Sequence, residues 1–115
     1  MYCISVNHKN SDAFIREKYA LNELEKKEFY DKVRKNKNIS GCICLMTCNR
    51  NEIYFEGNKA AVSEIENIYK EIKNIDINNL RQHSMRYENK AAIKHLYKVI
   101  CGLDSAVLGE AEIIR

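Results

Sequence analysis

The stretch that decides the fold is Cys42-Ile43-Cys44-Leu45-Met46-Thr47-Cys48-Asn49-Arg50-Asn51-Glu52-Ile53-Tyr54-Phe55-Glu56. Its apolar first part, residues 42–46, predicts a buried strand, and a second strand-like run, residues 52–56, follows almost at once. The loop between them, residues 47–51, holds small polar residues and an arginine. A connection this short requires the two strands to be antiparallel neighbours in one sheet.

Cys48 lies where the buried strand gives way to this loop, so it is held in place and can still meet a substrate. A free thiol is only slightly ionised at neutral pH, because its pKa is about 8.5. The Arg50 guanidinium would raise the ionised fraction, or would grip a substrate carboxylate through its planar fork. Thr47 and Asn49 add a hydroxyl and an amide able to orient a ligand. Two interpretations stay open: a reactive thiol, or a small core residue before a solvated turn.

The composition is that of one small domain. The chain has 115 residues and a net charge of +3, and a chain of this length buries roughly two thirds of its unfolded surface. No apolar run approaches the length of about 18 residues that a membrane span needs, and the first residues lack a signal-peptide pattern. The five cysteines are odd in number and lack disulfide-framework spacing, so we expect reduced thiols and a cytoplasmic protein.

Positive charge gathers at residues 32–37, whereas acidic residues are dispersed over most of the remaining chain. Such a cluster is typical of a solvated helix end, and it is also compatible with weak attraction to phosphate. Composition alone does not decide between the two.

The predicted order of elements is strand, helix, strand, strand, helix, strand and a helical extension. Strands are expected at residues 2–6, 42–46, 52–56 and, at a sheet edge, 80–87. The first helix is expected to run from a cap at Ser11 or Asp12 to Tyr19, and the second from a capping box at Asn22 and Glu25 to the polar residues 36–40. Further helices are expected at residues 61–72, from Asn89 to Gly102, and from residue 106 onward. The simplest closure is an α+β fold, a ferredoxin-like βαββαβ antiparallel sheet with helices on one face, plus a C-terminal helical extension. That extension has no stop signal, which indicates a piece of a longer protein.

Cys42 and Cys44 alternate along a strand, so their thiols point to the same face. With Cys48 and a histidine they would suggest zinc, but a structural zinc site needs a second pair of ligands downstream, and the sequence has none. We therefore predict no metal, and we place Cys42, Cys44, Cys3 and Cys101 in the core.

His95 lies between the apolar Ala92 and Val99 in the last predicted helix. It is either a half-buried structural histidine or a general base for Cys48, and the sequence does not give the distance between them. The chain has only four glycines, so neither a G-x-G-x-x-G turn nor a P-loop can be built. We expect no dinucleotide site in this chain.

Three stretches taken together resemble the N-terminal domain of glutamyl-tRNA reductase. They are Asn7-His8-Lys9 with Ile15-Arg16-Glu17-Lys18; Thr47-Cys48-Asn49-Arg50-Asn51-Glu52-Ile53-Tyr54; and His95-Leu96-Tyr97-Lys98-Val99 running into Gly102-Leu103-Asp104-Ser105 and Val107-Leu108-Gly109-Glu110. The blocks follow the family's order over nearly the whole chain. The resemblance implies that residues 1–115 are the N-terminal catalytic, glutamyl-tRNA-binding domain, and that an extension toward a missing NADPH-binding domain begins near 109–115.

The resemblance also implies the chemistry. Cys48 would attack the ester joining glutamate to tRNA, and NADPH, bound by a domain absent from this chain, would reduce the resulting thioester to glutamate-1-semialdehyde for tetrapyrrole (porphyrin) synthesis. A thiol suits this role because a thioester accepts hydride, whereas an oxygen ester does not. Arg50 would bind the glutamate carboxylate as a fork, and His95 would assist proton movement. The other substrate-binding residues implied are Thr47, Asn49, Ser105, Glu110, Ala111 and Glu112.

The family usually continues Gly-Glu-Pro-Gln where this chain has Gly109-Glu110-Ala111-Glu112, so Glu112 adds a negative charge near an anionic substrate. The implied partners are glutamyl-tRNA(Glu), a second copy of the full-length protein through a missing C-terminal domain, and the downstream aminomutase, with no membrane. The rival interpretations are a thiol- or metal-handling ferredoxin-like module and a plain RNA-binding module. The second lacks the pattern of surface aromatic residues used for base stacking.

Overall fold

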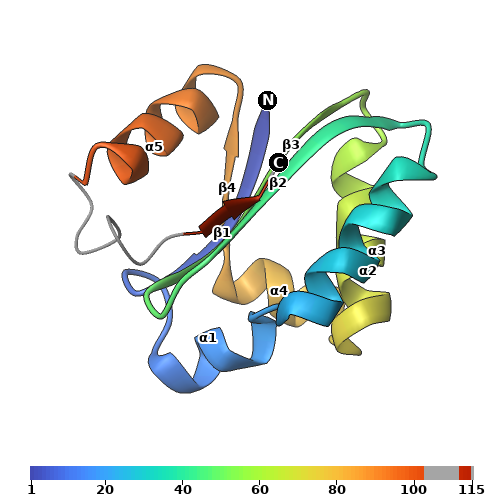
Figure 1. Cartoon of the computed structure of the whole chain (residues 1–115). Coiled ribbons are helices and arrows are strands. Elements are labelled where there is room, and N and C mark those ends of the chain that lie inside the picture. Colours follow the sequence, from blue (N-terminus) through green and yellow to red (C-terminus); the bar gives the residue numbers. More distant parts are fainter. Residues whose placement is uncertain (103–111, 115) are drawn as a thin grey trace.

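The computed structural model describes residues 1–102 and 112–114 (Figure 1). The strands are β1 (Tyr2–Asn7), β2 (Ile39–Met46), β3 (Arg50–Gly57), β4 (Met85–Glu88) and β5 (Glu112–Ile114). The helices are α1 (Ala13–Tyr19), α2 (Glu23–Arg34), α3 (Ala61–Lys73), α4 (Ile77–His83) and α5 (Lys90–Ile100). The strands form one antiparallel sheet in the order β4-β1-β3-β2-β5.

The predicted hairpin is the centre of this sheet. Met46 pairs with Asn51 and Cys44 with Ile53, so β2 and β3 are antiparallel neighbours as the short connection requires. On its other side, β3 pairs with β1 along its length. Because side chains alternate along β3, Ile53 faces one side of the sheet and Glu52 faces the other. The two faces therefore receive different chemistry from the same strand.

Helices α2 and α3 cover one face of the sheet (Figure 1). Phe29 of α2 and Ile65 and Tyr69 of α3 are buried there against Ile53 and Phe55 of β3. Full burial of each large apolar side chain contributes about 2 kcal/mol. The predicted N-terminal caps are both present: Asp12 caps α1, and Asn22 and Glu25 form the capping box of α2.

The second face is covered by α5, which lies on the opposite side of the sheet from α2 and α3 (Figure 1). Ala92 and Val99 of α5 pack against Cys3, Leu45 and Tyr54. The expectation of helices on one face only is therefore wrong. The last helix folds back on the sheet because its apolar side would otherwise be left in water.

The α+β class and the antiparallel sheet are confirmed, but the ferredoxin-like arrangement of four strands is not. A fifth strand, β5, extends the sheet at the β2 edge. Residues 112–114 were expected to be helical, and that prediction is wrong because they pair with residues 44–46 instead. Two of these three residues are isoleucine, a β-branched residue that favours strands. The rest of the expected extension, residues 106–111, lies outside the described residues.

The predicted strand at residues 80–87 is also wrong in its first half. Residues 77–83 form α4, whose N-terminus is capped by the Asp76 side chain accepting from the Asn78 backbone N–H. Leu80 is fully buried on the inner side of this helix. Only Met85–Glu88 is a strand, and it lies at the sheet edge as predicted.

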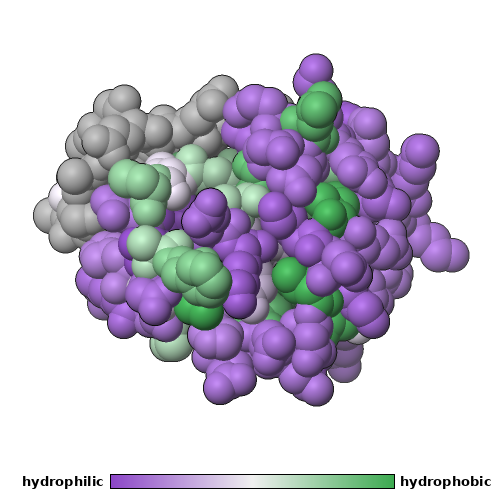
Figure 2. Space-filling model, turned by 90° about the horizontal axis from the view of Figure 1, so that it is seen from below, coloured by the Kyte–Doolittle hydropathy of each residue, from purple (hydrophilic) through white to green (hydrophobic). Residues whose placement is uncertain are grey.

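The surface seen from below is largely hydrophilic, with several separate apolar patches (Figure 2). None of the helices in the described part of the chain combines the length and the apolar character that a membrane crossing requires.

The end of β3 lies close to the segment before β2, so alanine substitutions at Gly57 and Gly41 should have different effects on the free energy of unfolding. A methyl group at Gly57 would overlap the Asn38 carbonyl oxygen and lie 2.6 Å from the Ala61 Cβ. Gly57→Ala should therefore lower the free energy of unfolding by about 2 kcal/mol. Gly41→Ala is the matched control, because a Cβ there meets nothing within 4 Å. Urea unfolding of both variants is the measurement, and equal losses would contradict the packing described.

Candidate functional site

Cys48 occupies a tight turn between β2 and β3 that its own neighbours close. The Thr47 backbone N–H donates to the Arg50 carbonyl at 2.8 Å. The Thr47 hydroxyl oxygen accepts from the backbone N–H groups of Asn49 and Arg50, both at 3.2 Å. These bonds engage both lone pairs of the hydroxyl, so its hydrogen is left to act as a donor. Thr47 thus shapes the turn before any ligand is present.

The segment from β1 to α1 clamps the same turn from outside. The Arg16 Nε–H donates to the Cys48 carbonyl at 3.2 Å, and the Asn51 side-chain amide donates to the Arg16 carbonyl at 2.7 Å. The His8 backbone N–H donates to the Asn49 carbonyl at 2.8 Å. The backbone around Cys48 is therefore fixed on both sides.

Cys48 is exposed on this fixed turn. It lines a shallow hollow of about 220 Å³ between the turn and α1. The other lining residues are Ala13, Arg16, Glu17, Ala20, Thr47 and Asn51. The interpretation of Cys48 as a core residue is therefore wrong, and a thiol in this position can meet a substrate.

The remaining cysteines divide as follows. Cys3 and Cys44 are buried, and Cys42 is half-buried and packs against the core, as predicted. Cys101 is exposed, so its predicted place in the core is wrong. It follows α5 directly, beyond the last helical residue that packs on the sheet.

Arg50 does not lie in a loop as expected, because β3 begins at this residue. Its side chain is fully buried, and Nη1 lies 3.1 Å from Oε2 of Glu52, which is also fully buried. Both charges have left water, and such a pair persists only when further hydrogen bonds support it.

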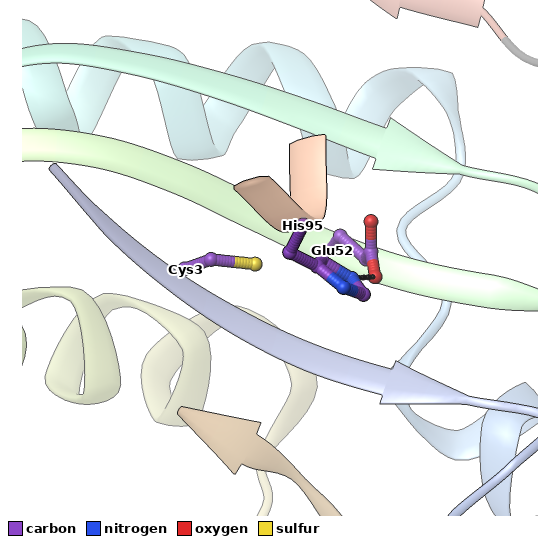
Figure 3. Close-up of side chains that lie close together, drawn as sticks. All are labelled: Cys3, Glu52 and His95. Carbon is purple, nitrogen blue, oxygen red and sulfur yellow. Dashed lines mark hydrogen bonds and ion pairs between the residues drawn. The ribbon is translucent and has the colours of Figure 1, made fainter. Parts of the chain in front are cut away.

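Glu52 receives that support from three elements. Its Oε2 accepts from the Ser5 hydroxyl at 2.6 Å and lies 2.6 Å from Nε2 of His95. Its Oε1 accepts from the Tyr54 hydroxyl at 2.6 Å. Figure 3 shows the His95 ring meeting the Glu52 carboxylate, with the Cys3 thiol beside them. A single carboxylate thus joins β1, β3 and α5.

The hydrogen bonds decide the charge of this cluster. Burial alone would raise the pKa of the Glu52 carboxyl, but the hydrogen bond and charge of His95, with the bonds from Ser5 and Tyr54, outweigh it and hold the pKa below its usual value. Glu52 is therefore ionised at neutral pH. Burial first, and the Glu52 charge second, raise the pKa of the Cys3 thiol well above its usual value, so that thiol is protonated.

Sequence reasoning missed Glu52, although a signal was present. Glu52 is a carboxylate that directly precedes the apolar residues Ile53, Tyr54 and Phe55 of the predicted strand. On the neighbouring strand Ser5 is the Cα partner of Glu52, and Asn7 follows on the same face. Polar residues at alternate positions of two adjacent strands indicate a polar cluster on one face of the sheet.

His95 lies on α5 and is nearly buried, with 7% of its surface exposed. Its ring stacks on Tyr87 of β4, with 4.2 Å between ring centroids and an interplanar angle of 12°. The structure connects His95 to Arg50 through Glu52, and not to Cys48 by any recorded bond among the described residues. Its role as an acid–base group for the thiol stays a prediction.

The other predicted site residues lie near the end of the chain. Ser105, Glu110 and Ala111 are outside the described residues. The backbone of Glu112 is described, and it pairs in β5 with Met46, the residue before Thr47. Glu112 is therefore next to the Cys48 turn in the sheet register.

Cys3, Glu52 and His95 are the described residues best placed to hold a metal. One ligand atom from each lies within 4.8 Å of the others, and thiolate, carboxylate and imidazole are all zinc ligands. However, Glu52 and His95 are already bonded to each other, and Glu52 also accepts from the Ser5 and Tyr54 hydroxyl groups. The cluster in Figure 3 is therefore built as a hydrogen-bond network rather than as an open set of ligands.

The fold and the site define an α+β domain that presents one thiol on a clamped turn and carries a buried Arg–Glu–His chain of contacts. The glutamyl-tRNA(Glu) reductase N-terminal domain matches residues 4–115 as a sequence family. The chain belongs to this family.

Individual relatives support the same assignment. The chain is 37% identical over 113 residues to a glutamyl-tRNA reductase of Campylobacter jejuni, covering 97% of this chain and 26% of that protein. It is 33% identical over 114 residues to the one of Campylobacter hominis, covering 96% of this chain and 27% of that protein. The structure of glutamyl-tRNA reductase from Methanopyrus kandleri shares the fold, with a TM-score of 0.68 and 23% identity over 95% of this chain and 24% of that one. The chain thus spans about a quarter of the length of these relatives.

The buried carboxylate predicts a pH-dependent contribution to stability. Glu52→Gln removes the buried negative charge that meets Arg50, Ser5, Tyr54 and His95, so the free energy of unfolding at neutral pH should fall by about 3 kcal/mol. Because the folded pKa is lowered, the contribution of Glu52 is present above about pH 4.3 and is lost as the pH falls through the folded pKa. The gap between wild type and variant should therefore narrow in acid.

The matched control is Glu56→Gln in the same strand. The Glu56 side chain is 55% exposed and pairs with the Met1 ammonium at 2.6 Å. Its loss should cost less than about 1 kcal/mol. Unfolding curves from pH 3 to 7, roughly the range in which carboxyl groups titrate, give the comparison. A Glu52→Gln gap that stays constant over this range would refute the ionised, hydrogen-bonded carboxylate.

Proposed function

We propose that this chain is the substrate-binding, nucleophile-bearing domain of an NADPH-dependent glutamyl-tRNA reductase, which makes glutamate-1-semialdehyde for tetrapyrrole synthesis. The observation that carries the proposal is Cys48, an exposed thiol on a turn whose backbone is clamped by Arg16 and His8. This turn is the Thr-Cys-Asn-Arg stretch of a chain that belongs to the reductase family.

The step assigned to this domain is acyl transfer. The Cys48 sulfur, having lost its proton, attacks the carbonyl carbon of the ester between glutamate and the terminal ribose of tRNA. A carbon–sulfur bond forms, the carbon–oxygen bond to the ribose breaks, and the ribose oxygen takes up a proton. No electrons are exchanged with a cofactor in this step. The remaining hydroxyl hydrogen of Thr47 is a donor for the carbonyl oxygen, and His95 is the acid–base group that we assign to proton transfer.

Arg50 is the residue that we assign to the side-chain carboxylate of glutamate. Its ion pair with Glu52 orients the guanidinium, which carries five N–H donors and can contact more than one carboxylate. Because the side chain is fully buried, substrate binding has to displace the side chains that cover it. Asn49, Ser105, Glu110, Ala111 and Glu112 are assigned to the rest of the substrate.

The described residues do not fit NADPH. Gly41, Gly57 and Gly102 are far apart in the chain, so no glycine-rich dinucleotide turn can form among them. The relatives are about four times longer than this chain, and we assign the hydride transfer to the part of the protein that this chain does not include. Dimerisation and contact with the aminomutase remain predictions.

The first test is covalent trapping on this chain. After incubation with glutamyl-tRNA and rapid acid quenching, mass spectrometry should find one glutamyl adduct on Cys48. Cys48→Ser should abolish the thioester, whereas Cys101→Ser, which removes the other exposed thiol, should retain it. With NADPH present, released glutamate should form without semialdehyde. An adduct that survives in Cys48→Ser would contradict the assignment.

The second test concerns the guanidinium fork. Arg50→Lys keeps the charge beside Glu52 but loses the planar pair of donors, so acylation of Cys48 should slow about 30-fold, a loss of about 2 kcal/mol in transition-state binding. Arg34→Lys is the control, since Arg34 is exposed and pairs only locally with Asp31 at 2.7 Å. Single-turnover rates give the comparison. An Arg50→Lys chain that acylates at the wild-type rate would exclude bidentate recognition.

A further inference from the structure

The outer side of α5 carries positive charge that destabilises the helix. Lys90, Lys94 and Lys98 recur at every fourth residue, and α5 contains no acidic residue. Like charges at this spacing destabilise a helix, and Lys90 is at the N-terminal end, where the helix dipole disfavours a cation. All three lysines are exposed. The repulsion between these lysines lowers the stability of the free chain, and binding of a polyanion would remove it.

The basic cluster that the sequence made prominent is different. In residues 32–37, Lys32 is paired with Glu71 of α3 at 2.9 Å, so part of that charge is neutralised within the fold. Among the described residues, no ion pair is recorded for Lys94 or Lys98. In the described part of the chain, the charge of Lys94 and Lys98 is therefore not offset by a recorded ion pair and can attract an anionic partner.

Lys94 and Lys98 also line a hollow of about 470 Å³ between α5, β4 and the loop after β1. The other residues that line it are Asn7, Lys9, Asn10, Met85, Tyr87, Ala91 and His95. The loop that forms one wall continues into His8, whose backbone N–H bonds to the Asn49 carbonyl in the Cys48 turn at 2.8 Å. The basic hollow and the nucleophile thus share one loop.

Tyr97 provides a second kind of contact on the same side of the helix. It is 66% exposed and, at helical spacing, lies on the same side of α5 as Lys90 and Lys94. Exposed aromatic rings stack on unpaired bases, while neighbouring lysines contact phosphates. Tyr97 is a single exposed ring, so it does not form the pattern of surface aromatic residues that dedicated RNA-binding modules use.

We propose that the outer side of α5, defined by Lys90, Lys94, Tyr97 and Lys98, binds the unpaired 3′ end of the aminoacylated tRNA. This inference rests on the proposed function, and it adds the surface that holds the RNA. The lysines contact the backbone phosphates along the helix, and the Tyr97 ring stacks on a base. The hollow that Lys94 and Lys98 line is bordered by the loop whose His8 backbone N–H bonds to the turn that carries the nucleophile.

The first experiment measures how the dissociation constant for glutamyl-tRNA depends on salt. In the Lys94→Gln/Lys98→Gln variant the slope of log affinity against log salt should fall by about one unit or more, because two phosphate contacts are lost. The Lys35→Gln/Lys37→Gln variant removes the same charge from the other cluster and should keep the wild-type slope. Equal slopes in the two variants would overturn the proposal, as would binding to anionic lipid vesicles in place of tRNA.

The second experiment tests stacking. Tyr97→Ala should weaken binding of intact glutamyl-tRNA on the order of tenfold, and Tyr97→Phe should retain the affinity because the ring remains. With a tRNA whose unpaired 3′ end has been removed, the three chains should bind alike. A loss in Tyr97→Ala that persists with the shortened tRNA would show that the ring does not contact the unpaired end.

A third measurement separates failure of this inference from failure of the proposed function. A small glutamate α-thioester that lacks RNA should acylate Cys48 equally in wild type and in Lys94→Gln/Lys98→Gln, provided that their thermal unfolding coincides. If wild type is acylated while the salt slopes of the two lysine variants are equal, only the α5 surface is wrong. If neither the thioester nor glutamyl-tRNA acylates wild type, the proposed function is wrong as well.

Discussion

The carboxylate of Glu52 is the constraint on which the second face of the sheet depends. It is fully buried, and it is tolerable there only because Arg50, Ser5, Tyr54 and His95 all meet its oxygens. These partners come from β1, β3 and α5, so the position of α5 is set by a polar contact as well as by apolar packing. An apolar interface alone would leave the helix more freedom to slide.

The two faces of the sheet therefore differ in chemistry and in their contribution to stability. Under α2 and α3 the interior is apolar and supplies most of the hydrophobic stabilisation. Under α5 the apolar contacts of Ala92 and Val99 give way, one helical turn apart, to the polar pair of His95 and Glu52. The face under α5 can hold polar groups such as His95 and Glu52 because the apolar face under α2 and α3 supplies most of the stability of the fold.

The central hairpin could be predicted because its signal is local: an apolar run, a short polar loop and a second run. The amphipathic helices α3 and α5 were predicted for the same reason. The strand β5 could not be, because a segment of three residues becomes a strand only by pairing with the distant β2. Arg50 was predicted to lie in a loop because its burial could not be read from the sequence. It is buried against Glu52, and the burial of Glu52 depends on partners from β1 and α5.

The α4 helix was not predicted for a different reason: its capping residue Asp76 lies in a polar stretch that is typical of a loop. Within the candidate site, the resemblance to a family identified the turn around Cys48. Periodicity and spacing alone left the role of this thiol open. The buried Glu52 cluster needed the three-dimensional register, since Ser5 and His95 are far from Glu52 in sequence.

The clamped turn has an entropic consequence for Cys48. Its carbonyl is held by Arg16, and the adjoining peptide groups are bonded to Thr47 and His8. The backbone dihedral angles around Cys48 are thus already restricted before a reaction partner arrives. Ordering the sulfur for attack then costs the entropy of one side-chain rotor, whereas a cysteine on a floppy loop would also lose that of several backbone bonds.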